Sequence, residues 1–137
     1  MIQMPKVEKM LTNHEGIRHH PYKCTAGKTT IGVGRNLDDV GITYEEILFL
    51  LRNDINRCIN DLDRSFPWFA GLSEGRQMAL IDMCFNLGIS RLKKFKNMLA
   101  AFAVGNYTAA AAEAKDSAWY GQVGVRAKRV CEMIKEG

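Results

Sequence analysis

Apolar side chains recur every three or four residues over most of the chain, which is the spacing of helices that bury one face. The longest stripe predicts one helix and comprises Ile47, Leu51, Ile55, Ile59 and Leu62. Thr43 and Glu46 precede it in the S/T-x-x-E pattern, in which each side chain satisfies a free backbone N–H of the other residue. Pro67 follows the stripe and predicts that the helix ends before it, because proline disrupts a helix interior.

The same spacing predicts five further helices. Ser73 fits the start of one of them and Gly88 its end, because serine accepts a free N–H at helix starts and glycine adopts the backbone conformation that closes helices. Thr108 is the expected start of an alanine-rich helix. The five segments are, in chain order, residues 7–11, 73–88, 92–102, 108–115 and 125–134.

Residues 17–35 do not follow the helical spacing. A helix there is disfavoured by Pro21, Gly27, Gly32 and Gly34. Residues 22–24 and 29–33 are typical of the two strands of a β-hairpin, with a turn at 25–27 and a polar loop at 36–41. The pattern therefore predicts an α+β fold, mostly helical, with one small antiparallel sheet near the N-terminus.

The composition is that of one soluble domain. The chain has 137 residues, of which 47% are hydrophobic and 25% charged. No apolar run approaches the roughly 18 residues that span a bilayer. The first residues, MIQMPKVEKM, lack the basic and apolar regions of a signal peptide. The sequence therefore predicts a protein that is made and folded in the cytoplasm.

The chain has four cysteines, Cys24, Cys58, Cys84 and Cys131. They form no CxxC pair, and in a cytoplasmic protein they are expected to be reduced thiols. The last three lie in apolar helical patterns and are expected in the core. His19, His20 and Cys24 are too few for structural zinc, which takes four ligands at recognisable pair spacing, so no metal site is predicted.

Positive charge is concentrated in the last third of the chain. The net charge is +4, and the basic residues there gather in RLKKFK at 91–96 and RAKR at 126–129. Such a surface favours an anionic partner. No nucleic-acid recognition module is found, so no nucleic-acid partner is predicted.

Glu15 stands where the first predicted helix ends, directly before the hairpin. Side chains from two such elements can face each other across a cleft, which is the arrangement that glycoside hydrolysis needs. In that reaction one carboxylic acid protonates the leaving oxygen, and a second group acts on water or on the anomeric carbon from the other face. Glu15 fits the acid if its surroundings keep it protonated.

Glu15 is followed by eight residues, Cys24, five residues and Thr30. This spacing, with E-G-x-R at the glutamate and T-I-G-x-G at the threonine, resembles the active-site motif of the phage lysozymes of glycoside hydrolase family 24, the T-even phage type. That family has Asp or Cys at the middle position. Two further family segments resemble LSEGRQMALIDMCFNLG at 72–88 and SAWYGQVGVRAKRV at 117–130. The resemblance extends over nearly the whole chain.

The resemblance implies hydrolysis of bacterial peptidoglycan between N-acetylmuramic acid and N-acetylglucosamine by a phage endolysin. It gives Glu15 the role of general acid, Cys24 that of second catalytic group, and Thr30 the task of orienting the attacking water. Asn86 matches a substrate-groove amide, and Arg126 matches an arginine that contacts the catalytic glutamate. No cofactor is implied. A monomer is expected, which a phage holin releases from the host cytoplasm to the periplasm and wall, and which lyses the host.

The resemblance also implies a two-lobed lysozyme fold formed by one catalytic domain, residues 1–137. Its expected parts are a small lobe at about 15–42, a connecting helix at about 43–62, and a helical lobe from 1–14 and 63–137. The loop at 36–41 is shorter than in the T-even enzyme. Arg35 stands where that enzyme has a histidine, and its expected partner is Asp54.

The stereochemistry and two alternative functions stay open. A thiolate could attack the anomeric carbon and give retention, or act as base for a water held by Thr30 and give inversion. Because Glu15 is then the only carboxylate of the motif, a lytic transglycosylase that forms anhydro-muramic ends is the alternative enzyme. The non-catalytic alternative is an envelope-binding or nucleic-acid-binding protein with a decayed site. For the basic C-terminal segments, attraction to the anionic cell envelope is expected.

Overall fold

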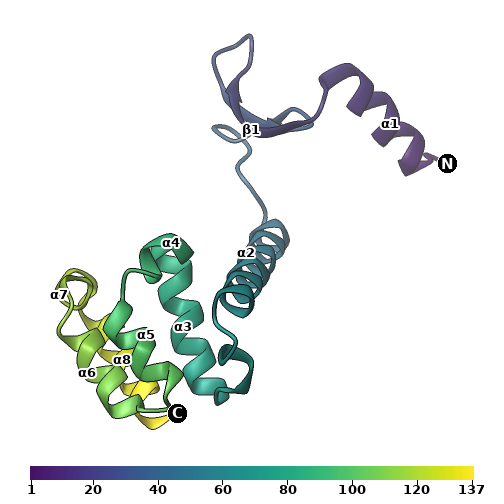
Figure 1. Cartoon of the computed structure of the whole chain (residues 1–137). Coiled ribbons are helices and arrows are strands. Elements are labelled where there is room, and N and C mark those ends of the chain that lie inside the picture. Colours follow the sequence, from purple (N-terminus) through teal and green to yellow (C-terminus); the bar gives the residue numbers. More distant parts are fainter. The chain divides into compact units, whose positions relative to one another are not determined.

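The computed structural model describes all residues from Met1 to Gly137 (Figure 1). The chain forms two compact units, Met1–Phe49 (unit 1) and Leu50–Gly137 (unit 2). The long helix α2, Tyr44–Ser65, begins in unit 1 and continues into unit 2. Helices dominate and the sheet is small and antiparallel, which confirms the predicted α+β class.

Unit 1 contains a helix followed by a three-stranded sheet. Its elements are α1 (Met4–Glu15), β1 (Arg18–Lys23), β2 (Thr29–Gly32) and β3 (Arg35–Asn36). The strand order is β1-β2-β3, so β2 lies in the centre. Pro21 lies in β1 where the register shifts between Arg18 and Tyr22. An edge strand tolerates this proline because its outer N–H positions have no partner in the sheet.

The strand β3 is an addition to the predicted hairpin. It pairs Asn36 with Thr30 and Arg35 with Ile31 across a tight turn at residues 33–34. Gly32, Val33 and Gly34 lie between the paired Ile31 and Arg35, and Gly34 has φ 70°, a positive value that glycine adopts without steric cost. The expected polar loop therefore begins after the third strand.

The start of α2 confirms the predicted capping box. The Thr43 N–H donates to Glu46 Oε1 at 2.8 Å, and the Glu46 N–H donates to Thr43 Oγ1 at 3.2 Å. The helix ends at Ser65, before Pro67, as predicted. Only two of its residues are buried, Cys58 and Leu62. Neither this helix nor any other is long and apolar enough to cross a membrane.

Unit 2 is a helical bundle around one core. After α2 its elements are η1 (Phe69–Gly71), α3 (Glu74–Leu87), α4 (Ile89–Leu92), α5 (Lys96–Ala103), α6 (Tyr107–Lys115), α7 (Ala118–Val123) and α8 (Val125–Glu136). Helix α6 packs against α5 and α8, and α3 packs against α8 (Figure 1). The largest fully buried side chains are Phe102, Leu62, Leu80, Met83, Leu92, Met98, Ile134 and Val130.

The helix ends follow the sequence in part. Ser73 caps α3 by accepting the Arg76 N–H, and Gly88 follows the last residue of the helix, as predicted. The helix predicted over 92–102 begins only at Lys96, as α5, and Leu92 is instead the last residue of α4. Phe95 leaves helical geometry between them, and its ring packs edge-on against Trp119 at 6.2 Å between centroids. Tertiary packing has therefore overridden the local helical pattern.

Two further features of unit 2 differ from the sequence prediction. Asn106, not Thr108, caps α6, since its side chain accepts the Ala109 N–H at 3.1 Å. The short helix α7 is not marked by an apolar stripe, and Ser117 caps it. Gly124, with φ 68°, separates α7 from α8.

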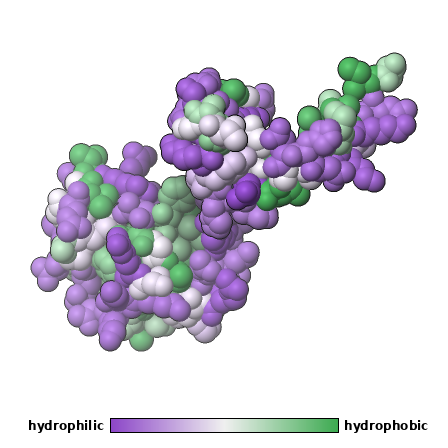
Figure 2. Space-filling model, turned by 90° about the horizontal axis from the view of Figure 1, so that it is seen from above, coloured by the Kyte–Doolittle hydropathy of each residue, from purple (hydrophilic) through white to green (hydrophobic).

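Burial matches the predicted distribution of thiols and charges. Cys58, Cys84 and Cys131 are buried, as expected, whereas Cys24 is partly exposed. The basic side chains of residues 91–96 and 126–129 are exposed, while Leu92 and Ala127 between them are buried. Figure 2 shows hydrophilic residues over most of the visible face. Helix α1 has no buried residue, and its assignment to the helical lobe stays a prediction.

Candidate active site

Glu15 is the last residue of α1, and its carboxyl group lies against the turn between β2 and β3. Gly16 follows with φ 76° and donates its N–H to the Thr12 carbonyl at 2.8 Å, which ends the helix. A Cβ on Gly34 would lie 3.2 Å from Glu15 Oε2. The absence of a side chain at Gly34 therefore makes room for the Glu15 carboxyl group, which is exposed within its unit.

Cys24 lies directly after β1, in the turn that leads to β2. Its N–H donates to the Lys28 carbonyl at 3.0 Å, and its carbonyl accepts the Gly27 N–H at 2.8 Å. Backbone hydrogen bonds from Lys28 and Ala26 lower the pKa of the Cys24 thiol, because an N–H that points at sulfur favours the thiolate. Partial burial opposes this shift. The turn thus favours the reactive form of the thiol.

Thr30 lies in β2, the central strand of unit 1, and is the one buried polar residue, at 3% exposure. Its hydroxyl donates to the Lys28 carbonyl at 2.9 Å. After the backbone of Lys28 and Ala26, the Thr30 side chain makes a smaller contribution to the lowered pKa of the Cys24 thiol. The structure therefore brings Cys24 and Thr30 together, and places Glu15 in the same unit at the adjoining turn.

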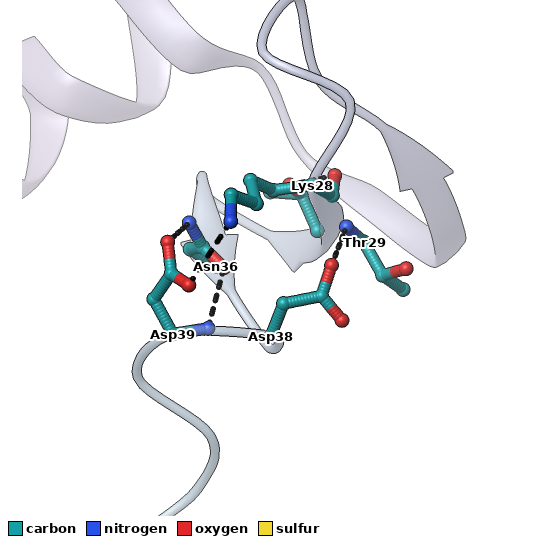
Figure 3. Close-up of polar contacts among 6 residues, drawn as sticks. Lys28, Thr29, Asn36, Asp38 and Asp39 are labelled. Carbon is teal, nitrogen blue, oxygen red and sulfur yellow. Dashed lines mark hydrogen bonds and ion pairs between the residues drawn. The ribbon is translucent and has the colours of Figure 1, made fainter.

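The loop after β3 is bonded to the first residue of β2 and to the residue before it (Figure 3). Asp38 accepts the Thr29 N–H at 2.8 Å, and Lys28 pairs with Asp39 at 3.2 Å. Asn36 closes the loop on itself, since it donates to Asp39 and accepts the Asp39 N–H, each at 3.0 Å. These aspartates were not predicted. Their signal was the N-x-D-D run that starts at the last residue of β3, a composition typical of side-chain-bonded turns.

Arg35 forms an ion pair within unit 1. It donates to Glu46 Oε1 at 2.7 Å and to the Gly41 carbonyl at 3.1 Å. This hydrogen bond is the main cause that lowers the pKa of Glu46 to about 2. In place of the expected Asp54, Arg35 uses the capping-box carboxylate, because the capping box fixes Glu46 at the start of α2, close behind the sheet in sequence. Asp54 pairs with Arg57 at 2.8 Å.

Asn86 lies on α3 of unit 2, and Arg126 contacts α3 from α8. Asn86 accepts the indole N–H of Trp119 at 3.3 Å. Arg126 donates to the Asp82 carboxylate at 2.7 Å and to the Asp82 carbonyl at 3.3 Å. Asp82 and Asn86 share one face of α3, because residues four apart lie above one another on a helix. Asp82 was not predicted, and the expected contact of Arg126 with Glu15 stays a prediction.

The small antiparallel sheet with its flanking helix and the separate helical bundle are the elements of a lysozyme-like α+β protein. Residues 12–132 match the phage lysozyme family. Because the match covers most of the chain, the protein belongs to this family.

The chain spans different shares of the relatives to which it is similar. The chain is 31% identical, over 94% of its length, to the pre-baseplate central spike protein Gp5 of Enterobacteria phage T4. It is 29% identical, over 96% of its length, to the probable T4-type lysozyme 2 of Dictyostelium discoideum, and 34% identical, over 80%, to the SAR-endolysin of Haemophilus phage HP1. The chain spans 27% of the spike protein, 94% of the T4-type lysozyme and 61% of the SAR-endolysin.

Proposed function

We propose that the protein is an endolysin that hydrolyses the β-1,4 bond between N-acetylmuramic acid and N-acetylglucosamine in bacterial peptidoglycan and so lyses the host cell. The observation that carries the proposal is the Cys24 turn, where backbone N–H groups and the Thr30 hydroxyl favour a thiolate. An activated sulfur at the second position of a lysozyme motif is what a working site requires and a decayed one does not. Membership of the phage lysozyme family supports the substrate class.

Glu15 acts as the general acid. Its proton passes to the glycosidic oxygen as the bond to the anomeric carbon breaks, so that the leaving sugar departs as an alcohol. The room beside Gly34 keeps the carboxyl group free of a crowding side chain.

Cys24 acts from the opposite face of the sugar, by one of two routes. As a nucleophile its thiolate forms a bond to the anomeric carbon, and water then cleaves this intermediate with overall retention. As a base it takes a proton from a water that Thr30 orients, and this water attacks with inversion. The lowered pKa of Cys24 serves both routes. The anomer formed first, observed by NMR, distinguishes them.

Asn86 and Arg126 are proposed to bind substrate from unit 2. Each is already held by one partner, Trp119 and Asp82 respectively, so their side chains are oriented before substrate arrives. Such orientation reduces the entropy lost on binding. The exposed basic segments 91–96 and 126–129 would attract the anionic envelope. We further propose that the enzyme is a monomer and that a phage holin releases it from the host cytoplasm to the wall.

The test is the mass of the fragments released from purified peptidoglycan. Hydrolysis gives muropeptides with reducing N-acetylmuramic acid ends, which borohydride reduces. The second candidate is a lytic transglycosylase, because the motif has a single carboxylate. Such an enzyme gives anhydro ends, which are lighter by one water and resist borohydride. A protein that binds the peptidoglycan sediment and releases no fragments would be the non-catalytic alternative. We expect the reducible products.

A further inference from the structure

Two of the buried thiols lie side by side in unit 2. Cys58 projects from α2 and Cys84 from α3, and they are 9% and 3% exposed. Both side chains line one pocket, together with Asp54, Asp61 and Phe85. The pair is thus buried among helices yet reached from the surface through this pocket.

The Cys58 thiol influences the Cys84 thiol across this pocket. Burial first, and then the charge and hydrogen bonding of Cys58, raise the pKa of the Cys84 thiol to about 12. The geometric basis for this influence is the shared pocket, to which α2 contributes Cys58 and α3 contributes Cys84. Cys131 lines a different pocket with Lys115 and Tyr120, and so is not part of this pair.

We propose that Cys58 and Cys84 form a reversible disulfide that fastens α2 to α3. Helix α2 has only two buried side chains, and Cys58 is one of them. A covalent bond at this position would therefore hold the helix where few other contacts do. This disulfide is separate from the lytic reaction. Its biological use rests on the proposed function, since an endolysin that leaves a reducing cytoplasm meets conditions in which disulfides persist.

The bond forms by exchange with a low-molecular-weight disulfide of the glutathione class. The Cys58 thiolate attacks one sulfur of the reagent and releases the other as a thiolate, which takes up a proton. The Cys84 thiol then loses its proton to solvent, and its sulfur attacks Cys58 Sγ and releases the second thiol. Two protein thiols are oxidised, and one reagent disulfide is reduced to two thiols. Cys58 reacts first because it is the more exposed and because the raised pKa keeps Cys84 protonated.

The experiment uses the full chain in mixtures of oxidised and reduced glutathione of increasing ratio. Remaining thiols are blocked with N-ethylmaleimide after unfolding, and the digested protein is analysed by mass spectrometry without reduction. We expect a peptide pair joined through Cys58 and Cys84 that lacks two hydrogens and separates on reduction. Cys84→Ser should abolish the joined pair, and Cys131→Ser should leave it intact.

Wild-type protein alone decides the proposal, even if a variant fails to fold. Three results would overturn the proposal. They are that N-ethylmaleimide blocks both thiols at the most oxidising ratio, that glutathione stays on either sulfur, or that either cysteine bonds to another one. The oxidised protein should also melt at a temperature several degrees higher than the reduced one. Equal melting would refute the fastening of α2. None of these readouts uses peptidoglycan, so an inactive protein could still form the bond and an active one could fail to.

Discussion

The pKa of the Cys24 thiol is lowered by the backbone of Lys28 and Ala26 and, to a smaller extent, by the side chain of Thr30. A buried strand residue thus tunes a partly exposed turn residue. The family motif places a threonine six positions after the second catalytic group, and here the turn between β1 and β2 converts that spacing into contact. We therefore expect Thr30 to affect the reactivity of the Cys24 thiol.

Replacement of Cys24 tests whether its thiol takes part in catalysis. Cys24→Asp should stay within about tenfold of wild-type lytic activity, since a carboxylate can serve either as nucleophile or as base. Cys24→Ala should lose at least about 10²-fold, the low end of what a general base contributes. Initial rates of turbidity loss on permeabilised cells measure both. Wild-type rates in the alanine variant would remove Cys24 from the mechanism.

The pH dependence of Cys24 alkylation should show the effect of the Thr30 hydroxyl on the pKa of the thiol. Because its pKa is lowered in the folded protein, alkylation by iodoacetamide should reach half its maximal rate at a lower pH than in urea-unfolded protein. Thr30→Val should move this midpoint upward, while Thr30→Ser, which keeps the hydroxyl, should not. Peptide mass spectrometry follows Cys24 separately from the other thiols. A folded midpoint at or above the unfolded one would contradict the proposed activation.

Gly34→Ala tests the space around Glu15, and Gly41→Ala is its matched control. Both glycines have positive φ, 70° and 68°, so each alanine should destabilise the protein similarly, by about 1–2 kcal/mol. Only at Gly34 does the new Cβ approach the Glu15 carboxyl group. At matched folded fractions, judged by circular dichroism, activity should fall for Gly34→Ala alone. Equal losses in the two variants would mean that the contact has no catalytic consequence.

The pair of Glu46 with Arg35 should make stability acid-sensitive. The folded pKa of Glu46, about 2, lies below its unfolded value of about 4.3, so the pair stabilises the protein above the unfolded value. This stabilisation is lost as pH falls through the window between them. Glu46→Gln should therefore show a smaller drop in melting temperature from pH 5 to pH 2 than wild type. Glu45→Gln, one residue earlier and outside the pair, should keep the wild-type slope.

Features that depend on neighbouring residues could be predicted from the sequence. The Thr43 and Glu46 capping box, the Ser73 cap and the break at Pro67 act over three or four residues, and all three are confirmed. The motif of Glu15, Cys24 and Thr30 could be recognised in the sequence because its spacing resembles that of a known family.

Features that depend on distant segments could not be predicted. The break at Phe95 follows from contact with Trp119, and the partner of Arg126 on α3 is far away in sequence. The strand β3 is too short to show alternation. The N–H groups around Cys24 are backbone atoms, so no side-chain pattern marks them.

The central claim is that Glu15 supplies the proton for glycosidic cleavage, and Glu15→Gln tests it most directly. The amide keeps the shape of the side chain and cannot act as the acid. Glu8→Gln, an exposed change on the same helix, is the control. On permeabilised cells the Glu15 variant should lose 10²- to 10⁴-fold in lytic rate while its circular dichroism and melting match wild type, and the control should lyse normally. A folded Glu15→Gln protein that keeps more than about a tenth of wild-type activity would contradict the account, because a missing general acid costs far more.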